Sequence, residues 1–173
     1  LDRILPRTRA DLAERKGRLP LAALERRARE ASAPLDFAAA LAGPGLHLIA
    51  EVKKASPSRG QLVHNLDVAA LARTYVENGA SAISVLTDGP FFQGSLEDLA
   101  AVRAVAAPAG VPVLRKDFLV DPYQVYEARA WGADALLLIV AVLDQRELGD
   151  LLALTRQLGM EALVEVHTPK EVE

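Results

Sequence analysis

Four charged side chains stand at the ends of apolar runs in the sequence, where buried strands should stop. Glu51 and Lys53 end the first run, Lys116 ends the third and Glu165 ends the fifth. Carboxylates and ammonium groups that share a partly buried mouth shift one another's pKa values and can serve as acids and bases. Each residue alone is explained as well by a solvated strand tip or a structural ion pair. Together, at equivalent strand ends, the four predict a catalytic group.

Apolar runs and helical segments alternate along the chain from residue 46 onward. The runs are centred near Ile49, Ser84, Val113, Leu137 and Val164. Because some of them are apolar at nearly every position, they predict strands buried on both faces, as in parallel sheets covered by helices. Such alternation indicates an α/β protein of right-handed βαβ units, arranged either as a closed barrel or as an open doubly wound sheet.

Helix signals fill the intervals between these runs. Asp67, Ser95, Asp121 and Asp144 stand where helices should begin, and Gly132 stands where the helix after Asp121 should end. Short polar side chains accept hydrogen bonds from the free amides of a first turn, while glycine tolerates the left-handed conformation after a last turn. We therefore expect a helix in each interval.

The choice between barrel and open sheet depends on the first loop. A dinucleotide-binding sheet would show G-x-G-x-x-G there, and the segment from Glu51 to Gly60, EVKKASPSRG, lacks it. A barrel is therefore favoured, and barrels of this type place their active sites at the C-terminal ends of the strands. We expect residues 1–45 to form an N-terminal helical extension and residues 46–173 to form the first five strands of a (β/α)8 TIM barrel.

Two serines and a histidine near these strand ends are weaker candidates. Ser56 and Ser58 follow Lys53 in the first loop, where hydroxyls, amides and an ammonium could hold a phosphate or carboxylate. The same Ser-Pro-Ser sequence is common in ordinary turns. His167 has no partner in the sequence and is interpreted as a loop histidine.

Three phenylalanines are expected in loops after the second and third strands. They are Phe91, Phe92 and Phe118, in a chain that is only 5% aromatic. Aromatic rings in loops usually cover a ligand or a helix end. The cluster therefore indicates a pocket for a flat apolar group.

Composition narrows the class of partner. The 173 residues are 51% hydrophobic and 25% charged, with a formal net charge of −3, which favours a globular protein acting on a small molecule over a nucleic-acid or membrane-surface binder. There is no cysteine, and the three histidines lack ligand spacing, so no metal site is expected. The longest apolar stretch is too short for a bilayer span and the N-terminus lacks a signal core, so the cytoplasm is the expected location.

Six segments together resemble one family, the indole-3-glycerol phosphate synthases, which are barrel enzymes of tryptophan synthesis. The similarity is seen in residues 49–58, 83–88, 92–95, 114–118, 135–140 and 163–168. Their order and spacing hold across essentially the whole chain. Family members continue with three more strands, including amides after strands seven and eight that bind phosphate, so we expect the natural chain to extend beyond Glu173.

The resemblance implies a substrate and a set of roles. The substrate is 1-(2-carboxyphenylamino)-1-deoxyribulose 5-phosphate, which loses carbon dioxide and water on ring closure to indole-3-glycerol phosphate, without a cofactor. By resemblance, Lys116 is the general acid on the substrate carbonyl and Glu165 is the base for the later dehydration. Lys53 matches the lysine that holds the substrate carboxylate, and Glu51 matches the carboxylate that orients the lysines.

The resemblance also assigns substrate-binding residues. Ser56, with Ser58 in the same turn, matches the phosphate side, and Phe92, Phe118 and Leu137 match the wall around the anthranilate ring. A complete enzyme is expected to be a monomer.

Two other hypotheses remain open. The first is a non-catalytic piece that needs a complementing C-terminal segment or associates through its unpaired first and fifth strands. The second is another sugar-phosphate barrel enzyme, such as one of histidine or pyrimidine synthesis. The sequence Lys116-Asp117-Phe118 and the segment 163–168 argue against this second hypothesis.

Overall fold

The computed structural model describes residues 2–172, and its centre is one parallel sheet. The strand order is β1-β4-β5-β6-β7, and all four neighbouring pairs are parallel. The strands are β1 (Ile49–Val52), β4 (Ala82–Leu86), β5 (Val113–Lys116), β6 (Ala135–Ile139) and β7 (Glu161–Glu165). The five strands expected from the apolar runs are confirmed. A small antiparallel hairpin, β2 (Ala55–Ser56) with β3 (Gly60–Gln61), occupies the loop after β1.

Helices follow the strands as predicted. They are α4 (Val68–Glu77), α5 (Gly89–Phe92), α6 (Leu96–Ala106), α7 (Pro122–Ala130) and α8 (Gln145–Gln157), with short 3-10 turns η1 (Ala107–Ala109), η2 (Val140–Val142) and η3 (Pro169–Glu171). The predicted N-caps Asp67, Ser95, Asp121 and Asp144 each accept a first-turn amide, and Asp144 also forms a capping box. Gly132 follows α7 with φ of 88°, the conformation that ends a helix. Within residues 2–172, no helix is both long and apolar enough to cross a membrane.

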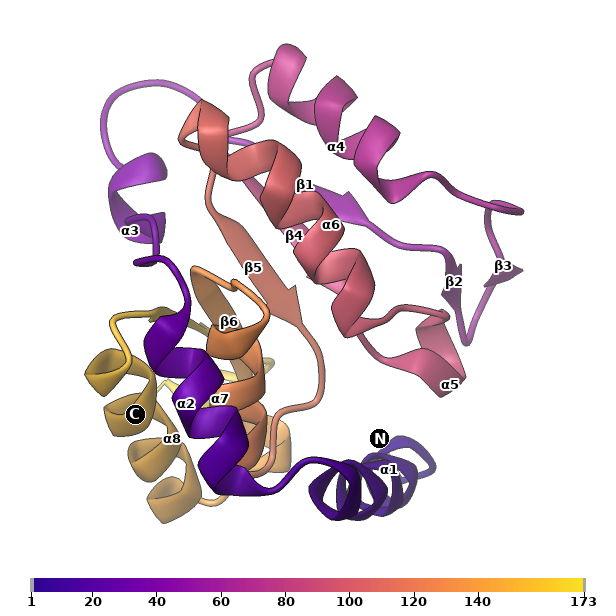
Figure 1. The fold of residues 1–173 in the computed structure, drawn as a ribbon, viewed down its shortest axis with the longest axis vertical. Coiled ribbons are helices and arrows are strands. Elements are labelled where there is room, and N and C mark those ends of the chain that lie inside the picture. The colour runs from indigo at the N-terminus through magenta and orange to yellow at the C-terminus, as the bar shows by residue number, and fades with distance from the viewer. Residues whose placement is uncertain (1, 173) are drawn as a thin grey trace.

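The N-terminal residues form three helices, α1 (Ile4–Arg18), α2 (Leu21–Glu30) and α3 (Phe37–Ala40). Leu12 and Leu24 are buried together with Tyr123 of α7, so α1 and α2 pack on α7. Phe37 of α3 is buried at the beginnings of the strands, whereas α5 and the β2–β3 hairpin lie at the opposite end (Figure 1). The expected helical extension is therefore present, and the division at residue 45 stays a prediction.

Strand register separates the side chains into two faces, because residues paired across parallel strands point the same way. Ile83 and Val113 are paired on one face and belong to the large core cluster beneath the helices. On the other face, Glu51 pairs with Ser84 and Leu86 pairs with Lys116. The charged residues Glu51 and Lys116 therefore lie on the face of the sheet that the helices do not cover.

The two outer strands are sheet edges in the described part of the chain, as predicted. β4 and β6 are buried at every position, whereas β7 is half-exposed throughout. Leu163 and Val164 of β7 are 39% and 37% exposed. An apolar edge of this kind is a surface onto which another strand can pair.

A buried carboxylate joins the extension to the sheet. Asp134 is fully buried, and it accepts hydrogen bonds from Leu35 N at 2.6 Å, Val113 N at 2.7 Å and Arg103 Nη1 at 2.5 Å. Burial raises the pKa of Asp134, although the two amides and the guanidinium oppose that rise. The carboxylate thus anchors three separate segments at the N-terminal end of the strands.

We predict that Asp134→Ala lowers the free energy of unfolding by about 3 kcal/mol or more, because one partner of a buried ion pair is lost and two amides are left unpaired. Chemical denaturation measures this loss. The control is Asp150→Ala, which removes an exposed helical pair with Arg146 and should cost no more than about 0.5 kcal/mol. Equal losses in the two variants would contradict the anchoring role.

Candidate active site

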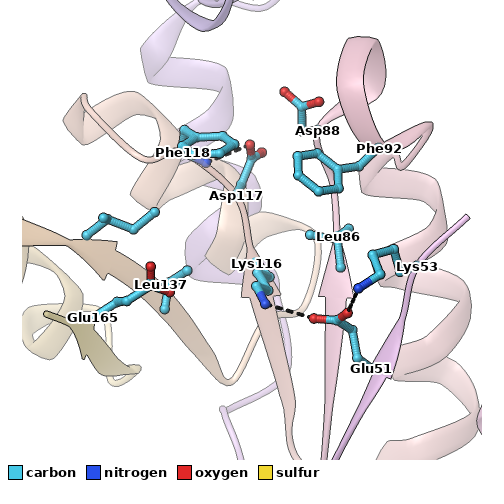
Figure 2. Close-up of a pocket in the computed structure, with 11 residues that line it drawn as sticks. Glu51, Lys53, Leu86, Asp88, Phe92, Lys116, Asp117, Phe118, Leu137 and Glu165 are labelled. Carbon is cyan, nitrogen blue, oxygen red and sulfur yellow. Dashed lines mark hydrogen bonds and ion pairs between the residues drawn. The ribbon is translucent and has the colours of Figure 1, made fainter. Parts of the chain in front are cut away.

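A cavity of about 180 Å³ opens at the C-terminal ends of the strands (Figure 2). Its lining includes all four charged residues singled out at the strand ends, together with three of the apolar candidates. The lining residues are Glu51, Lys53, Leu86, Asp88, Phe92, Lys116, Asp117, Phe118, Leu137, Ile139 and Glu165. Side chains from β1, β5 and β7, far apart in sequence, thus meet in one place.

One carboxylate bridges two lysines on one side of the cavity. Lys53 Nζ lies 2.5 Å from Glu51 Oε1, and Lys116 Nζ lies 2.8 Å from Glu51 Oε2. Burial pushes the pKa of Glu51 upward, but the hydrogen bonds and charges of Lys116 and Lys53 outweigh it and hold that pKa below its usual value. Tyr75 fixes the backbone beneath by donating its hydroxyl to the Glu51 carbonyl at 2.9 Å. The bridge holds both ammonium groups at the cavity.

Glu165 lies across the cavity from this bridge (Figure 2). His167 lies in the loop after β7, as predicted, and its Nε2 lies 3.1 Å from Glu165 Oε1, a neighbour that the sequence did not indicate. Glu165 is the last residue of β7, whereas His167 is in the bend that follows the strand. Both side chains are more than a third exposed, at 37% for Glu165 and 56% for His167.

Aromatic rings form the wall above the charged residues. The centroids of Phe92 and Phe118 are 6.3 Å apart, with their planes tilted by 39°. Phe92 belongs to the short helix α5, which Asp88 caps by accepting the Phe91 amide at 2.7 Å, and not to an irregular loop as expected. Phe91 is not part of the wall, because it lines a separate hollow beside Pro57. The expected group of three phenylalanines is corrected to two.

Ser56 and Ser58 are not among the residues that line the cavity. They belong to the β2–β3 hairpin, where their hydroxyl oxygens are 3.5 Å apart and Ser56 Oγ accepts the Arg59 amide at 3.3 Å. These contacts are those of a turn. The structure therefore does not bring the two serines together with the four charged residues.

Two aspartates in the cavity wall were missed by the sequence analysis. Asp88 and Asp117 are more than 90% buried and line the cavity on its aromatic side. Burial raises the pKa of Asp88, the nearby charge of Asp117 adds to that rise, and the Phe91 and Phe92 amides oppose it. Their signal was available, since each follows a predicted strand by one or two positions. Within residues 2–172, no group of histidines and carboxylates is arranged to hold a metal ion.

The family model described as indole-3-glycerol phosphate synthase matches residues 1–173. The chain belongs to the indole-3-glycerol phosphate synthase family. Two proteins named indole-3-glycerol phosphate synthase illustrate the similarity. That of Roseiflexus sp. (strain RS-1) is 57% identical over 176 residues, which cover 99% of this chain and 65% of the relative. That of Mycolicibacterium gilvum is 57% identical over 173 residues, covering 100% of this chain and 62% of the relative.

The chain thus spans less than two thirds of the length of these relatives. Among solved structures, a mandelate racemase/muconate lactonizing enzyme from Roseiflexus sp. matches with a TM-score of 0.35 and 17% identity, over 84% of this chain and 54% of that one. That likeness is too low to bear on fold or site. Indole-3-glycerol phosphate synthases are TIM barrels, so the parallel sheet is the first five strands of such a barrel and its open face is the barrel interior.

We predict that the pKa of Glu51 lies below its usual value and rises in Lys116→Met, because the strongest interaction that opposes the effect of burial is then lost. Since the folded pKa is lower than the unfolded one, the lysine contacts stabilise the fold above the unfolded pKa, and this stabilisation is lost as pH falls through the folded pKa. Carbon-13 NMR titration of the side-chain carboxyl measures the shift. Lys54→Met, which removes a separate pair with Asp98, is the control and should leave Glu51 unchanged. An unshifted Glu51 in Lys116→Met would contradict the bridge.

Proposed function

We propose that the complete protein is an indole-3-glycerol phosphate synthase. It would close the ring of 1-(2-carboxyphenylamino)-1-deoxyribulose 5-phosphate with loss of carbon dioxide and water, and would need no cofactor. Beyond family membership, one observation supports this most directly: two lysines bridged by Glu51 face a wall of two phenylalanines within a single cavity. The two lysine ammonium groups suit the carboxylate and the carbonyl of the substrate, and they lie next to an apolar surface that suits its aromatic ring.

Lys116 is proposed as the general acid. Ring closure is an attack of the substrate ring carbon on its own carbonyl carbon, and a proton on the carbonyl oxygen makes that carbon electrophilic. Lys116 Nζ is held at the cavity by Glu51 at 2.8 Å and has further protons available for a substrate oxygen. Glu51 therefore orients the lysine.

Lys53 and Glu165 complete the proposed mechanism. Lys53 is assigned to the substrate carboxylate, which its ammonium holds until that carboxylate leaves as carbon dioxide. Glu51 anchors the Lys53 ammonium at the cavity. Glu165 takes a proton from the ring carbon next to the one that bears the hydroxyl, while the hydroxyl, protonated by a lysine, leaves as water. Acid and base come from β5 and β7, on different sides of the cavity (Figure 2), so each step has its own catalytic group.

Substrate binding is assigned to the apolar wall and to the hairpin. Phe92, Phe118 and Leu137 would hold the anthranilate ring, since tilted aromatic pairs with an aliphatic neighbour suit a flat apolar group. Ser56 and Ser58 are assigned to the phosphate side. Their hairpin stands at the same end of the sheet as α5 (Figure 1), which supports a contact outside the cavity proper. We further propose that the complete enzyme is a monomer in the cytoplasm. Its partner is a small-molecule substrate and neither a nucleic acid nor a membrane.

A second candidate is a piece without a catalytic role, which associates with another chain through its open strand edge. The half-exposed β7 edge favours it, because Leu163, Val164 and Val166 are all more than a third exposed. The two candidates predict different outcomes in one experiment. Residues 1–173 are assayed by indole fluorescence with the carboxyphenylamino-deoxyribulose phosphate, alone and with the remainder of the Roseiflexus relative supplied as a second segment.

We expect turnover only when the second segment is present, because the family's phosphate-binding amides follow strands seven and eight. Circular dichroism of each mixture establishes that it is folded. A folded mixture without turnover would contradict the proposed function and favour the non-catalytic candidate.

We predict that Lys116→Ala in a chain completed by that segment lowers kcat by at least about 100-fold, because general acid catalysis is lost. The fold should change little, since Lys116 is about a third exposed and forms no part of the core. Arg146→Ala, at an exposed helical position, is the control and should leave kcat unchanged. Near-normal turnover in Lys116→Ala would remove the role assigned to this lysine.

A further inference from the structure

A fully buried arginine lies directly behind the proposed acid. Arg115 precedes Lys116 on β5 and points to the opposite face of the sheet, under α7. Its three guanidinium nitrogens are all used: Nε donates to Thr87 Oγ1 at 3.1 Å, Nη1 to the Gln124 carbonyl at 2.8 Å and Nη2 to Asp117 Oδ2 at 2.9 Å. A buried cation is tolerated only with such compensation. Nothing in the proposed mechanism uses this residue.

Asp117 connects this arginine to the cavity wall. Its Oδ2 accepts both Arg115 and the Thr87 hydroxyl, the latter at 2.7 Å, while its Oδ1 accepts the Phe118 amide at 2.8 Å. The residues on either side of Lys116 are thus bonded to each other behind the sheet. These bonds therefore involve both neighbours of Lys116 and the backbone amide of Phe118.

Glu127 of α7 supplies the second carboxylate of the cluster. Its Oε2 lies 3.4 Å from both Nη1 and Nη2 of Arg115, and Arg15 Nε of α1 lies 3.0 Å from its Oε1. Two arginines and two carboxylates therefore form a neutral row, Arg15, Glu127, Arg115 and Asp117. Without the Glu127 charge, Asp117 would be the only carboxylate paired with Arg115 within residues 2–172, and the guanidinium would be drawn toward it.

We infer that Glu127 and Arg115 are positioning residues for the proposed reaction. The pair does not touch the cavity. It holds the Arg115 guanidinium between two carboxylates, so that Asp117 keeps the strand end in the conformation that directs Lys116 and Phe118 into the cavity. This inference rests on the proposed function, because positioning matters for catalysis only where Lys116 acts.

The test uses Glu127→Gln, which keeps the size of the side chain and removes its charge, in the chain completed by the remainder of the Roseiflexus relative. We expect kcat to fall at least about tenfold, since displacement of a catalytic group by a fraction of an ångström lowers the rate steeply. KM should rise by a smaller factor than kcat falls, because Phe118 contributes to substrate binding while Lys116 acts mainly in the transition state.

The matched control is Asp134→Asn, which removes the charge of another fully buried carboxylate paired with an arginine, at the opposite end of the strands. It should destabilise the protein to a similar or greater degree while kcat stays as in the parent. Both variants are assayed well below their unfolding midpoints. Parent-like kcat in Glu127→Gln, or an equal fall in both variants, would overturn the inference.

A second readout is independent of turnover. Hydrogen exchange of the Phe118 amide, which Asp117 holds at 2.8 Å, should become at least about tenfold faster in Glu127→Gln and stay unchanged relative to the β6 amides in Asp134→Asn. An inactive completed chain without substitutions would refute the proposed function, and the exchange result would then decide only whether Glu127 holds the strand end. Unchanged Phe118 exchange in Glu127→Gln would overturn it.

Discussion

Residues paired across parallel strands point to the same face, and most features of this protein depend on that constraint. Glu51 shares its level with Ser84, Leu86 shares its level with Lys116, and Ile139 shares its level with Glu165. A shift of one residue in β1, β5 or β7 would turn the charged side chain at the open face toward the helices. The same register therefore supports the core and assembles the cavity, so that neither can change without the other.

Three charged groups illustrate how burial decides the partners that a charge needs. Glu51 is only partly buried and requires two lysines, which stay accessible to a ligand. Arg115 and Asp134 are fully buried, and each uses its hydrogen-bonding capacity on the protein itself. Because desolvation of an ion is costly, the fully buried groups have compensating bonds on several sides. Buried charges consequently anchor segments, and half-buried charges remain available for chemistry.

The two ends of the sheet have different tasks. At the N-terminal ends, Phe37 and Asp134 tie the helical extension to the strands through burial and hydrogen bonds. At the C-terminal ends, cavity-lining charges replace apolar contacts, and the wall is supplied by α5 and the loop after β5. This separation places stability and chemistry on different residues of the same strands, as is general in barrels of this type.

The sequence predicted the strand positions from apolar runs and the helix starts from capping side chains, which are local signals. It also predicted the convergence of Glu51, Lys53, Lys116 and Glu165, because the C-terminal ends of parallel strands meet at one end of a sheet. The separation of Phe91 from Phe92 was not predictable, since two adjacent residues in a short helix point in different directions according to how that helix packs. Tertiary structure likewise decided three other arrangements. They are the pairing of His167 with Glu165, the position of Ser56 and Ser58 outside the cavity lining, and the charged row of Arg15, Glu127, Arg115 and Asp117. Side chains far apart in sequence, or close in sequence but on a bent loop, acquire partners only when packing brings their atoms within hydrogen-bonding distance.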